Sequence, residues 1–245
     1  MKIVLISDTH GRHEHLTSVG MGNILPEGDL LIHAGDLTNV GGKGEVIDVL
    51  DWLIEIAPRY THGIVFIAGN HDRGFDPKYN LNGNDKPDYL KHRLEDLELS
   101  DYGVTYLENN SCEIDGIKIW GSPITPWFYG DRWAFNRHRG EEINEVWNGI
   151  PLDTNIIITH GPPYGYNDYV ARDHSYVGCF DLAKRIGEIK PLITVHGHIH
   201  GSRGYSRDEH THYINASILD EGYEISYKPM ILDVDFENKV VNVSE

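Results

Sequence analysis

Five short polar segments contain residues that could bind a metal ion or transfer a proton. They are Asp8-Thr9-His10, Gly35-Asp36, Gly69-Asn70-His71-Asp72, Thr159-His160-Gly161 and Gly197-His198-Ile199-His200. Each follows a short apolar run, and such near-continuous runs are typical of strands that are covered on both faces. The carboxyl ends of these strands line one crevice of an α/β sheet, so residues far apart in the sequence can meet there. The pattern therefore predicts one site assembled from both halves of the chain.

The donor groups in these segments suit two transition-metal ions. Carboxylates come from Asp8 and Asp36, an amide oxygen comes from Asn70, and imidazoles come from His10, His160, His198 and His200. A mixed oxygen and nitrogen set fits Mn, Fe, Zn or Ni better than Ca, and it does not choose among these four. Seven ligands are too many for one catalytic zinc with an open position, whereas two ions about 3.5 Å apart can share a carboxylate. Asp36 is our candidate for the shared ligand.

Such a site would favour phosphate chemistry. Two divalent ions, two carboxylates and a bridging hydroxide leave a net positive charge, which would attract an anionic phosphoester. The ions would activate the hydroxide for in-line attack and stabilise the charge that develops on the phosphoryl group. We expect His71 to donate a proton to the leaving alkoxide, with Asp72 orienting its ring. The catalytic candidates are thus His71, Asp36 and Asn70.

The intervening segments alternate between strand and helix patterns. Residues 45–57 place Val46, Leu50 and Leu53 on one face of a helix that Pro58 ends. Asp115-Gly116 is a tight hairpin turn between two β-like pieces. Further helices are predicted at 87–99 and 178–189, a short loop or helix at 11–22, and strands at 211–216, 230–234 and 239–243. This order predicts a mixed α/β sandwich rather than a purely parallel sheet.

Length and composition favour a soluble, single-domain protein. The chain has 245 residues, and the five segments span it from residue 8 to residue 200, so we expect one domain over 1–245. A net charge of -17 would repel a long nucleic acid. No apolar run approaches the roughly 20 residues of a membrane span, and the chain enters a strand at once, without room for a signal peptide. Without a long apolar run we expect no membrane partner. Cys112 and Cys179 form no disulfide framework, so together with the missing signal peptide they predict a cytoplasmic protein.

At these residues the sequence resembles the calcineurin-like metallophosphoesterase superfamily, whose signature has the same residue types in the same order. The resemblance covers nearly the whole chain. It implies an α/β fold with two facing mixed β-sheets flanked by helices. It also implies that one metal is held by Asp8, His10, Asp36 and His200, the other by Asp36, Asn70, His160 and His198, and that His71 is the acid.

A narrower resemblance links the chain to the MPPED-type metallophosphodiesterases. It rests on Thr125-Pro126-Trp127-Phe128, Ala134-Phe135-Asn136, Thr159-His160-Gly161-Pro162-Pro163, Val177-Gly178-Cys179 and Ile214-Asn215-Ala216-Ser217. That group is associated with phosphodiester hydrolysis, including cyclic nucleotides, usually supported by Mn. Its vertebrate members carry Gly where this chain has His198, so this chain has a full second metal site. The resemblance favours Mn over Fe, Zn and Ni.

We therefore expect a dinuclear metal-dependent hydrolase of a small phosphodiester, with a cyclic nucleotide as the candidate substrate. A phosphomonoesterase or protein Ser/Thr phosphatase would use the same metals, and a non-catalytic interaction scaffold could keep the same fold. Several residues stay unassigned: His33 and His196 adjoin the motifs, Arg12 follows the first of them, and Trp127 to Phe135 could stack on a nucleobase or simply pack in a loop.

Overall fold

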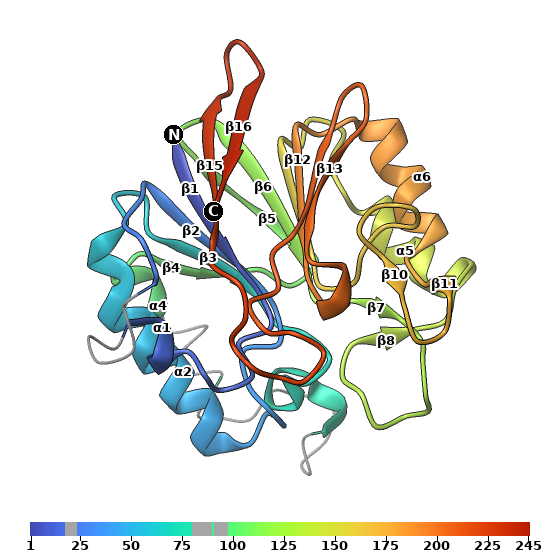
Figure 1. Ribbon diagram of the computed structural model, residues 1–245, viewed down its shortest axis with the longest axis horizontal. Helices are drawn as coiled ribbons and strands as arrows, with labels where there is room; N and C mark the ends of the chain where they lie inside the picture. Colours follow the sequence, from blue (N-terminus) through green and yellow to red (C-terminus); the bar gives the residue numbers. More distant parts are fainter. Residues whose placement is uncertain (18–23, 80–89, 91–97) are drawn as a thin grey trace.

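Two facing β-sheets form the centre of the molecule. The structure, a computed structural model, describes residues 1–17, 24–79, 90 and 98–245. The first six-stranded sheet has the order β16-β15-β1-β2-β3-β4, and the second has the order β13-β14-β12-β9-β6-β5. In Figure 1 helices α1, α2 and α4 lie outside the first sheet, and α5 and α6 lie outside the second. The expected class, two mixed sheets flanked by helices, is confirmed.

The strands of the first sheet are parallel at its centre and antiparallel at one edge. Strands β1 to β4 run parallel, while β15 pairs antiparallel with β1 and with β16. Their bounds are β1 Lys2–Ile6, β2 Leu30–Ala34, β3 Ile64–Ile67, β4 Val104–Tyr106, β15 Met230–Asp235 and β16 Val240–Ser244. The carboxyl ends of β1, β2 and β3 therefore meet at one end of this sheet.

The second sheet has the same mixed character. Strands β6, β9, β12 and β14 are parallel, and β5 and β13 are antiparallel edge strands. Their bounds are β5 Asn110–Ile114, β6 Ile117–Ser122, β9 Ile156–Thr159, β12 Ile193–His196, β13 Gly204–Arg207 and β14 His212–Asn215. Asp115 and Gly116 join β5 to β6 with φ angles of +51° and +76°, which confirms the predicted tight hairpin.

Alternating side chains of the strands enter two separate hydrophobic layers, because successive residues of a strand point to opposite faces. In β1, Ile3 and Leu5 pack between the sheets, whereas Val4 and Ile6 pack beneath the outer helices. Both faces of the central strands are thus buried, which explains their continuous apolar sequence.

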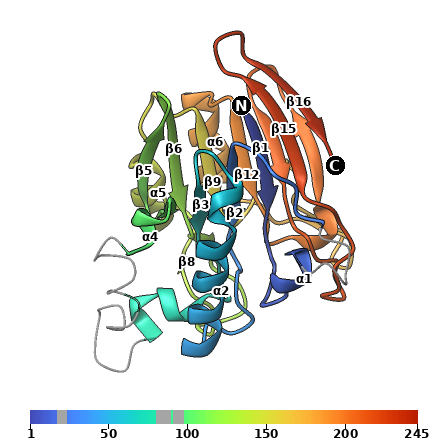
Figure 2. The same ribbon diagram turned by 90° about the vertical axis from the view of Figure 1, so that its left-hand side faces the viewer.

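The helices confirm the sequence predictions where these can be compared, with shifted ends. Helix α2 is Lys43–Ile56 rather than residues 45–57, and a 3₁₀ turn, η2 Ala57–Arg59, follows it. Helix α6 is Phe180–Ile189, because Cys179 caps it by accepting the backbone N–H of Leu182. Figure 2 shows α2 lying along the face of the first sheet.

Other elements are short. Helix α1 is Glu14–Thr17 and α4 is Glu98–Asp101, while most of the helix predicted at 87–99 lies outside the described residues. Helix α5, Glu141–Asn148, has no counterpart in our sequence predictions. The remaining pieces are the ribbons β7 Thr125–Pro126 with β8 Asn136–Arg137 and β10 Tyr169–Val170 with β11 Ser175–Tyr176, and the turns η3 Arg73–Phe75, η4 Pro77–Tyr79 and η5 His200–Ser202.

Candidate metal centre

The five polar segments converge at one end of the two sheets, where they follow β1, β2, β3, β9 and β12. Backbone hydrogen bonds join the loops: Asp8 N–H donates to Gly35 O at 2.9 Å, and Gly197 N–H donates to His160 O at 3.1 Å. Four of the predicted ligands have positive φ angles, which non-glycine residues rarely adopt and which cluster at functional sites. These residues are Asp8, His10, Asp36 and His198.

One group of ligand atoms comes from Asp8, His10 and His200, all buried. The Nε2 of His200 lies 3.3 Å from Asp8 Oδ1, and the Nδ1 of His200 contacts the backbone oxygen of Asp220 at 3.0 Å. Asp8 also accepts hydrogen bonds from the Ser217 hydroxyl at 2.8 Å and from the backbone N–H of His198. These contacts fix the carboxylate and the His200 ring in a single orientation.

A second group comes from Asp36, His160 and His198. The Nε2 of His160 lies 3.2 Å from Asp36 Oδ2 and 2.9 Å from Asn70 Oδ1. The other ring nitrogen of His160 contacts the backbone oxygen of Ala34 at 2.9 Å, which sets the ring orientation. The structure thus brings Asn70 next to this group, as predicted.

Asp36 also belongs to a third group, with His10 and His71, and so links the two sides of the site. The Nε2 of His10 lies 3.7 Å from Asp36 Oδ2. The seven ligands predicted from the sequence therefore lie together, with Asp36 in the middle.

The residues fit bound metal. Both ring nitrogens of His10 are buried and have no hydrogen-bond partner among the described residues. A buried polar atom without a partner costs about 1–3 kcal/mol, so such atoms are normally satisfied by a ligand or an ion. A divalent ion held by Asp8, His10 and His200 would satisfy one of these nitrogens.

The carboxylates and imidazoles of the site shift one another's pKa values. Burial favours the neutral form of Asp36, but His160, His10 and His71 together outweigh it and hold the pKa of this carboxyl well below its usual range. Burial alone would lower the pKa of His160, but Asp36, Asp8 and the Ala34 carbonyl together raise it to about 9. Burial dominates at His10, whose pKa falls to about 4. At neutral pH the metal-free site therefore carries two ionised carboxylates and an unprotonated His10, whereas His160 holds a proton that a bound metal ion would displace.

His71 lies at the edge of the ligand cluster, and Asp72 does not orient its ring. The Nδ1 of His71 contacts the backbone oxygen of Asn39 at 2.6 Å. The Asp72 carboxylate instead accepts the backbone N–H groups of Leu37, Thr38 and Gly69. Asp72 therefore holds the loops after β2 and β3 together, and the orienting role that we expected for it belongs to a backbone carbonyl.

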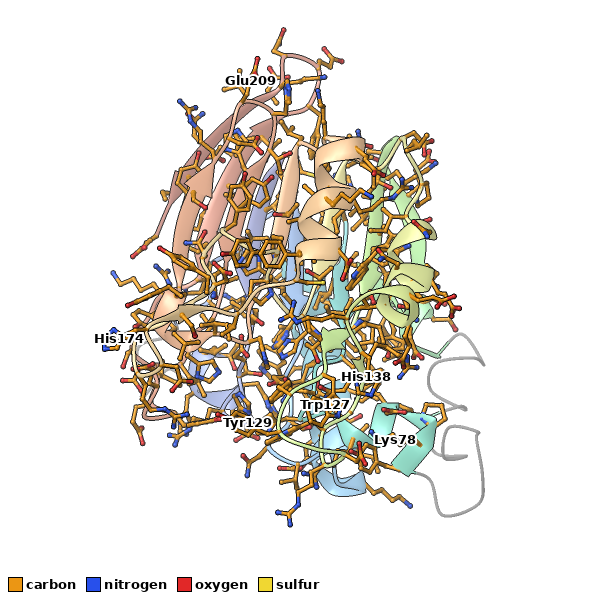
Figure 3. The ribbon with its side chains drawn as sticks, turned by 90° about the vertical axis from the view of Figure 1, so that its right-hand side faces the viewer. Lys78, Trp127, Tyr129, His138, His174 and Glu209 are labelled. Carbon is orange, nitrogen blue, oxygen red and sulfur yellow. The ribbon has the colours of Figure 1, made fainter. Side chains whose placement is uncertain are left out.

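A cavity of about 630 Å³ opens beside the metal ligands and is lined in part by Asp36, His71 and His198. Its outer wall comes from the β7–β8 loop, including Trp127 and Tyr129. Figure 3 shows both residues at the lower end of the molecule, far from Glu209 on the β13–β14 turn. Part of the aromatic segment thus lines the cavity, and part of it, Ala134 and Phe135, is buried.

His33 and Arg12 hold loops in place. The Nε2 of the buried His33 lies 3.0 Å from the Thr9 hydroxyl, and its Nδ1 accepts the backbone N–H of Gly35 at 3.3 Å. Arg12 pairs with Glu224 at 3.0 Å at the surface. His196 is buried, and neither of its ring nitrogens has a partner among the described residues.

His33 makes the metal-free protein sensitive to acid. Burial lowers its pKa from 6.5 to about 3, so below pH 6.5 the unfolded chain takes up a proton that the folded chain resists. Stability due to this residue is complete above pH 6.5 and falls as the pH decreases toward about 3. At pH 5 the loss is about 2 kcal/mol relative to pH 7.5. Urea unfolding at both pH values should show a smaller loss for His33→Gln than for the unmodified chain; equal losses would contradict this role.

Gly197 allows the segment after β12 to approach Asp8. A Cβ atom at this position would lie 2.0 Å from Asp8 Oδ2 and 2.1 Å from Ser7 Oγ. Because Asp8 is buried and hydrogen-bonded, Gly197→Ala should reduce the free energy of unfolding by about 1–3 kcal/mol and weaken metal binding. Gly187→Ala in α6 is the matched control, since nothing lies within 4 Å of its added Cβ. Urea unfolding and metal analysis compare the two; a Gly197→Ala variant as stable as the control would exclude this close approach.

Two facing mixed sheets with aspartate, histidine and asparagine side chains at their strand ends define the class of metal-dependent phosphoesterases. The chain belongs to the calcineurin-like phosphoesterase family, which it matches over residues 1–202. It is 35% identical over 242 residues to human metallophosphoesterase domain-containing protein 1, and the match covers 95% of this chain and 71% of the human protein. The MPPED-type resemblance is thereby confirmed.

Solved structures support the fold. The protein TT1561 of Thermus thermophilus is similar with a TM-score of 0.61 at 14% identity, covering 99% of this chain and 97% of that one. Phosphopantetheinyl hydrolase from Mycobacterium tuberculosis has a TM-score of 0.51 at 14% identity, covering 89% of each chain. Across the described residues, we find no helix both long enough and apolar enough to cross a bilayer.

Proposed function

We propose that this protein is a dinuclear metal-dependent phosphodiesterase that acts on small diesters, with a cyclic nucleotide as the candidate substrate. The observation that carries the proposal is the central position of Asp36. Its carboxylate belongs to one ligand group with His160 and His198 and to another with His10 and His71. One carboxylate that belongs to two sets of donors can be shared by two metal ions, which supports a dinuclear site.

Asp8, His10, Asp36 and His200 would hold one ion, and Asp36, Asn70, His160 and His198 the other. We propose Mn for both, on the basis of the MPPED-type relationship; the mixed donor set is compatible with Mn. When bound, two such ions lower the pKa of a coordinated water and offset negative charge on the phosphoryl group.

His71 is positioned to protonate the leaving group. Its Nδ1 donates to the Asn39 carbonyl, so the proton for the leaving group comes from Nε2 of the doubly protonated ring. The Asn39 contact holds the ring while the proton moves to the departing alkoxide. The side chain also lines the cavity, where the substrate would bind.

The cavity supports a small substrate. Its volume of about 630 Å³ lies within the usual range of small-molecule sites, roughly 300–1,000 Å³. The net charge of -17 disfavours a long nucleic acid as the partner. We also propose a cytoplasmic location, which agrees with the free thiols of Cys112 and Cys179.

Diester and monoester turnover distinguish this function from its alternatives. The protein is stripped of metal, Mn is restored, and hydrolysis of bis-p-nitrophenyl phosphate is compared with that of p-nitrophenyl phosphate. We expect a higher kcat/KM for the diester. Preference for the monoester would favour a phosphomonoesterase or a protein phosphatase, and folded protein without turnover under any of the four metals would favour a scaffold.

A further inference from the structure

The loop between β14 and β15 places a tyrosine beside the candidate metal centre. The ring centroid of Tyr223 lies 5.0 Å from that of His10 and 5.1 Å from that of His200, with its ring steeply inclined to both. It lies 6.4 Å from the ring centroid of His71. The side chain is 42% exposed and lines the cavity. Tyr223 therefore lies between the metal ligands and the space where a substrate would bind.

The loop that carries Tyr223 is closely tied together. The Asp220 carboxylate accepts the backbone N–H groups of Gly222 and Glu224 and the hydroxyl of Ser226. Tyr223 itself donates its N–H to Asp220 O at 3.0 Å and has a φ angle of +61°, a costly conformation for a residue with a side chain. These contacts fix the direction in which the tyrosine leaves the loop.

The same loop is attached to both segments that Tyr223 faces. The backbone oxygen of Asp220 contacts His200 Nδ1 at 3.0 Å. The Glu224 carboxylate accepts two hydrogen bonds from Arg12, at 3.0 and 3.3 Å, two residues beyond His10. Contacts made by the rest of the loop therefore fix the position of Tyr223 relative to His10 and His200. Groups that contact a substrate are usually supported by neighbouring residues in this way.

The charges along the cavity suit a singly charged substrate. Arg139 donates to the backbone oxygens of Val177 and Gly178, and Arg172 pairs with Asp173. The Tyr223 hydroxyl has no hydrogen-bond partner among the residues described by the structure. Beside His10 and His200 the substrate thus meets the neutral phenol of Tyr223, while the two arginines that line the cavity are held by other groups. A phosphodiester carries one negative charge, whereas a monoester dianion would benefit from a cation at this position.

We propose that Tyr223 contacts the substrate and selects phosphodiesters over monoesters, by donating a hydrogen bond from its hydroxyl to a nonbridging phosphoryl oxygen. This inference rests on the proposed function, since it concerns the same site. The phenol supplies one donor without added charge, which matches the single charge of a diester.

Two substitutions test the proposal. Tyr223→Phe keeps the ring and removes the donor, so kcat/KM for bis-p-nitrophenyl phosphate should fall by about tenfold or more, with Mn content and Tm unchanged. Tyr223→Arg adds a cation, so the monoester-to-diester ratio of kcat/KM should rise by about tenfold. Tyr102→Phe is the matched control, because Tyr102 is an exposed tyrosine outside the cavity lining.

These measurements distinguish failure of the proposed function from failure of the role of Tyr223. If the unmodified protein hydrolyses neither ester under Mn, Fe, Zn or Ni, the proposed function itself has failed. If the unmodified protein is active, a Tyr223→Phe variant within twofold of the Tyr102→Phe control would overturn the contact. Loss of activity that parallels loss of Mn, or an unchanged ester ratio in Tyr223→Arg, would overturn the selective role.

Discussion

Replacing Asp36 with asparagine should abolish diester hydrolysis and empty both metal positions at once. The substitution keeps the shape of the side chain and removes the negative charge that both ligand groups share. A bound ion contributes several kcal/mol of charge stabilisation in a phosphoryl-transfer transition state, so we expect kcat to fall about a thousandfold or more. Turnover of bis-p-nitrophenyl phosphate and Mn content per chain measure the two effects.

The control for this substitution is Asp153→Asn. Asp153 forms a surface ion pair with Lys118, and its loss should change neither quantity. An Asp36→Asn variant that keeps two Mn per chain would show that the carboxylate is not shared. Normal turnover with reduced Mn content would show that the second ion has no part in catalysis.

Replacing His71 with alanine should have the second largest effect, and one that depends on the leaving group. An acid that protonates the departing oxygen matters most when that oxygen is a poor leaving group, and such catalysis contributes about 10²- to 10⁴-fold. Diphenyl phosphate should therefore lose about 100-fold or more in kcat, while bis-p-nitrophenyl phosphate should lose much less. Mn content should stay unchanged.

His71 also belongs to a candidate metal-ligand group with His10 and Asp36, so the Mn content of the variant distinguishes an acid from a ligand. A fall in the Mn content of His71→Ala would identify it as a metal ligand rather than an acid. Equal losses for both diesters would also contradict the acid role. His62→Ala is the control. Among the charged groups that the structure describes, His62 forms an ion pair only with Asp115, at 3.1 Å near the surface.

The convergence of the candidate ligands was accessible from the sequence because buried parallel strands have continuous apolar sequences. Each run therefore marks the strand end where a polar residue must face the crevice. Asp8, Asp36 and His160 are found in this way, although they are far apart in the chain. The hairpin at Asp115-Gly116 was also predictable, because few residue pairs adopt two successive positive φ angles.

The groups that support the ligands were harder to predict. The partner of His71 is the backbone oxygen of Asn39, and every residue has such an oxygen, so no residue type marks it. The contact of Ser217 with Asp8 had a signal, because Ser217 ends one of the segments shared with the MPPED-type proteins. Tyr223 had none, since its position depends on how the loop from Leu219 to Ile225 folds back on His10 and His200.

Helix α5 escaped prediction for a different reason. It has only eight residues, and its apolar positions are Ile143, Val146 and Trp147, with acidic and amide side chains at the other five. Such a short pattern does not distinguish a helix from a loop. Its stability depends instead on packing against α6, which the sequence does not display.

The most direct test of two-metal catalysis is a titration of the metal-free protein with Mn, in which bound Mn and turnover of bis-p-nitrophenyl phosphate are measured together. We predict no turnover without metal, little with one Mn per chain, and a plateau when two are bound. Full turnover with one Mn per chain, or turnover that persists after metal removal, would contradict a dinuclear site.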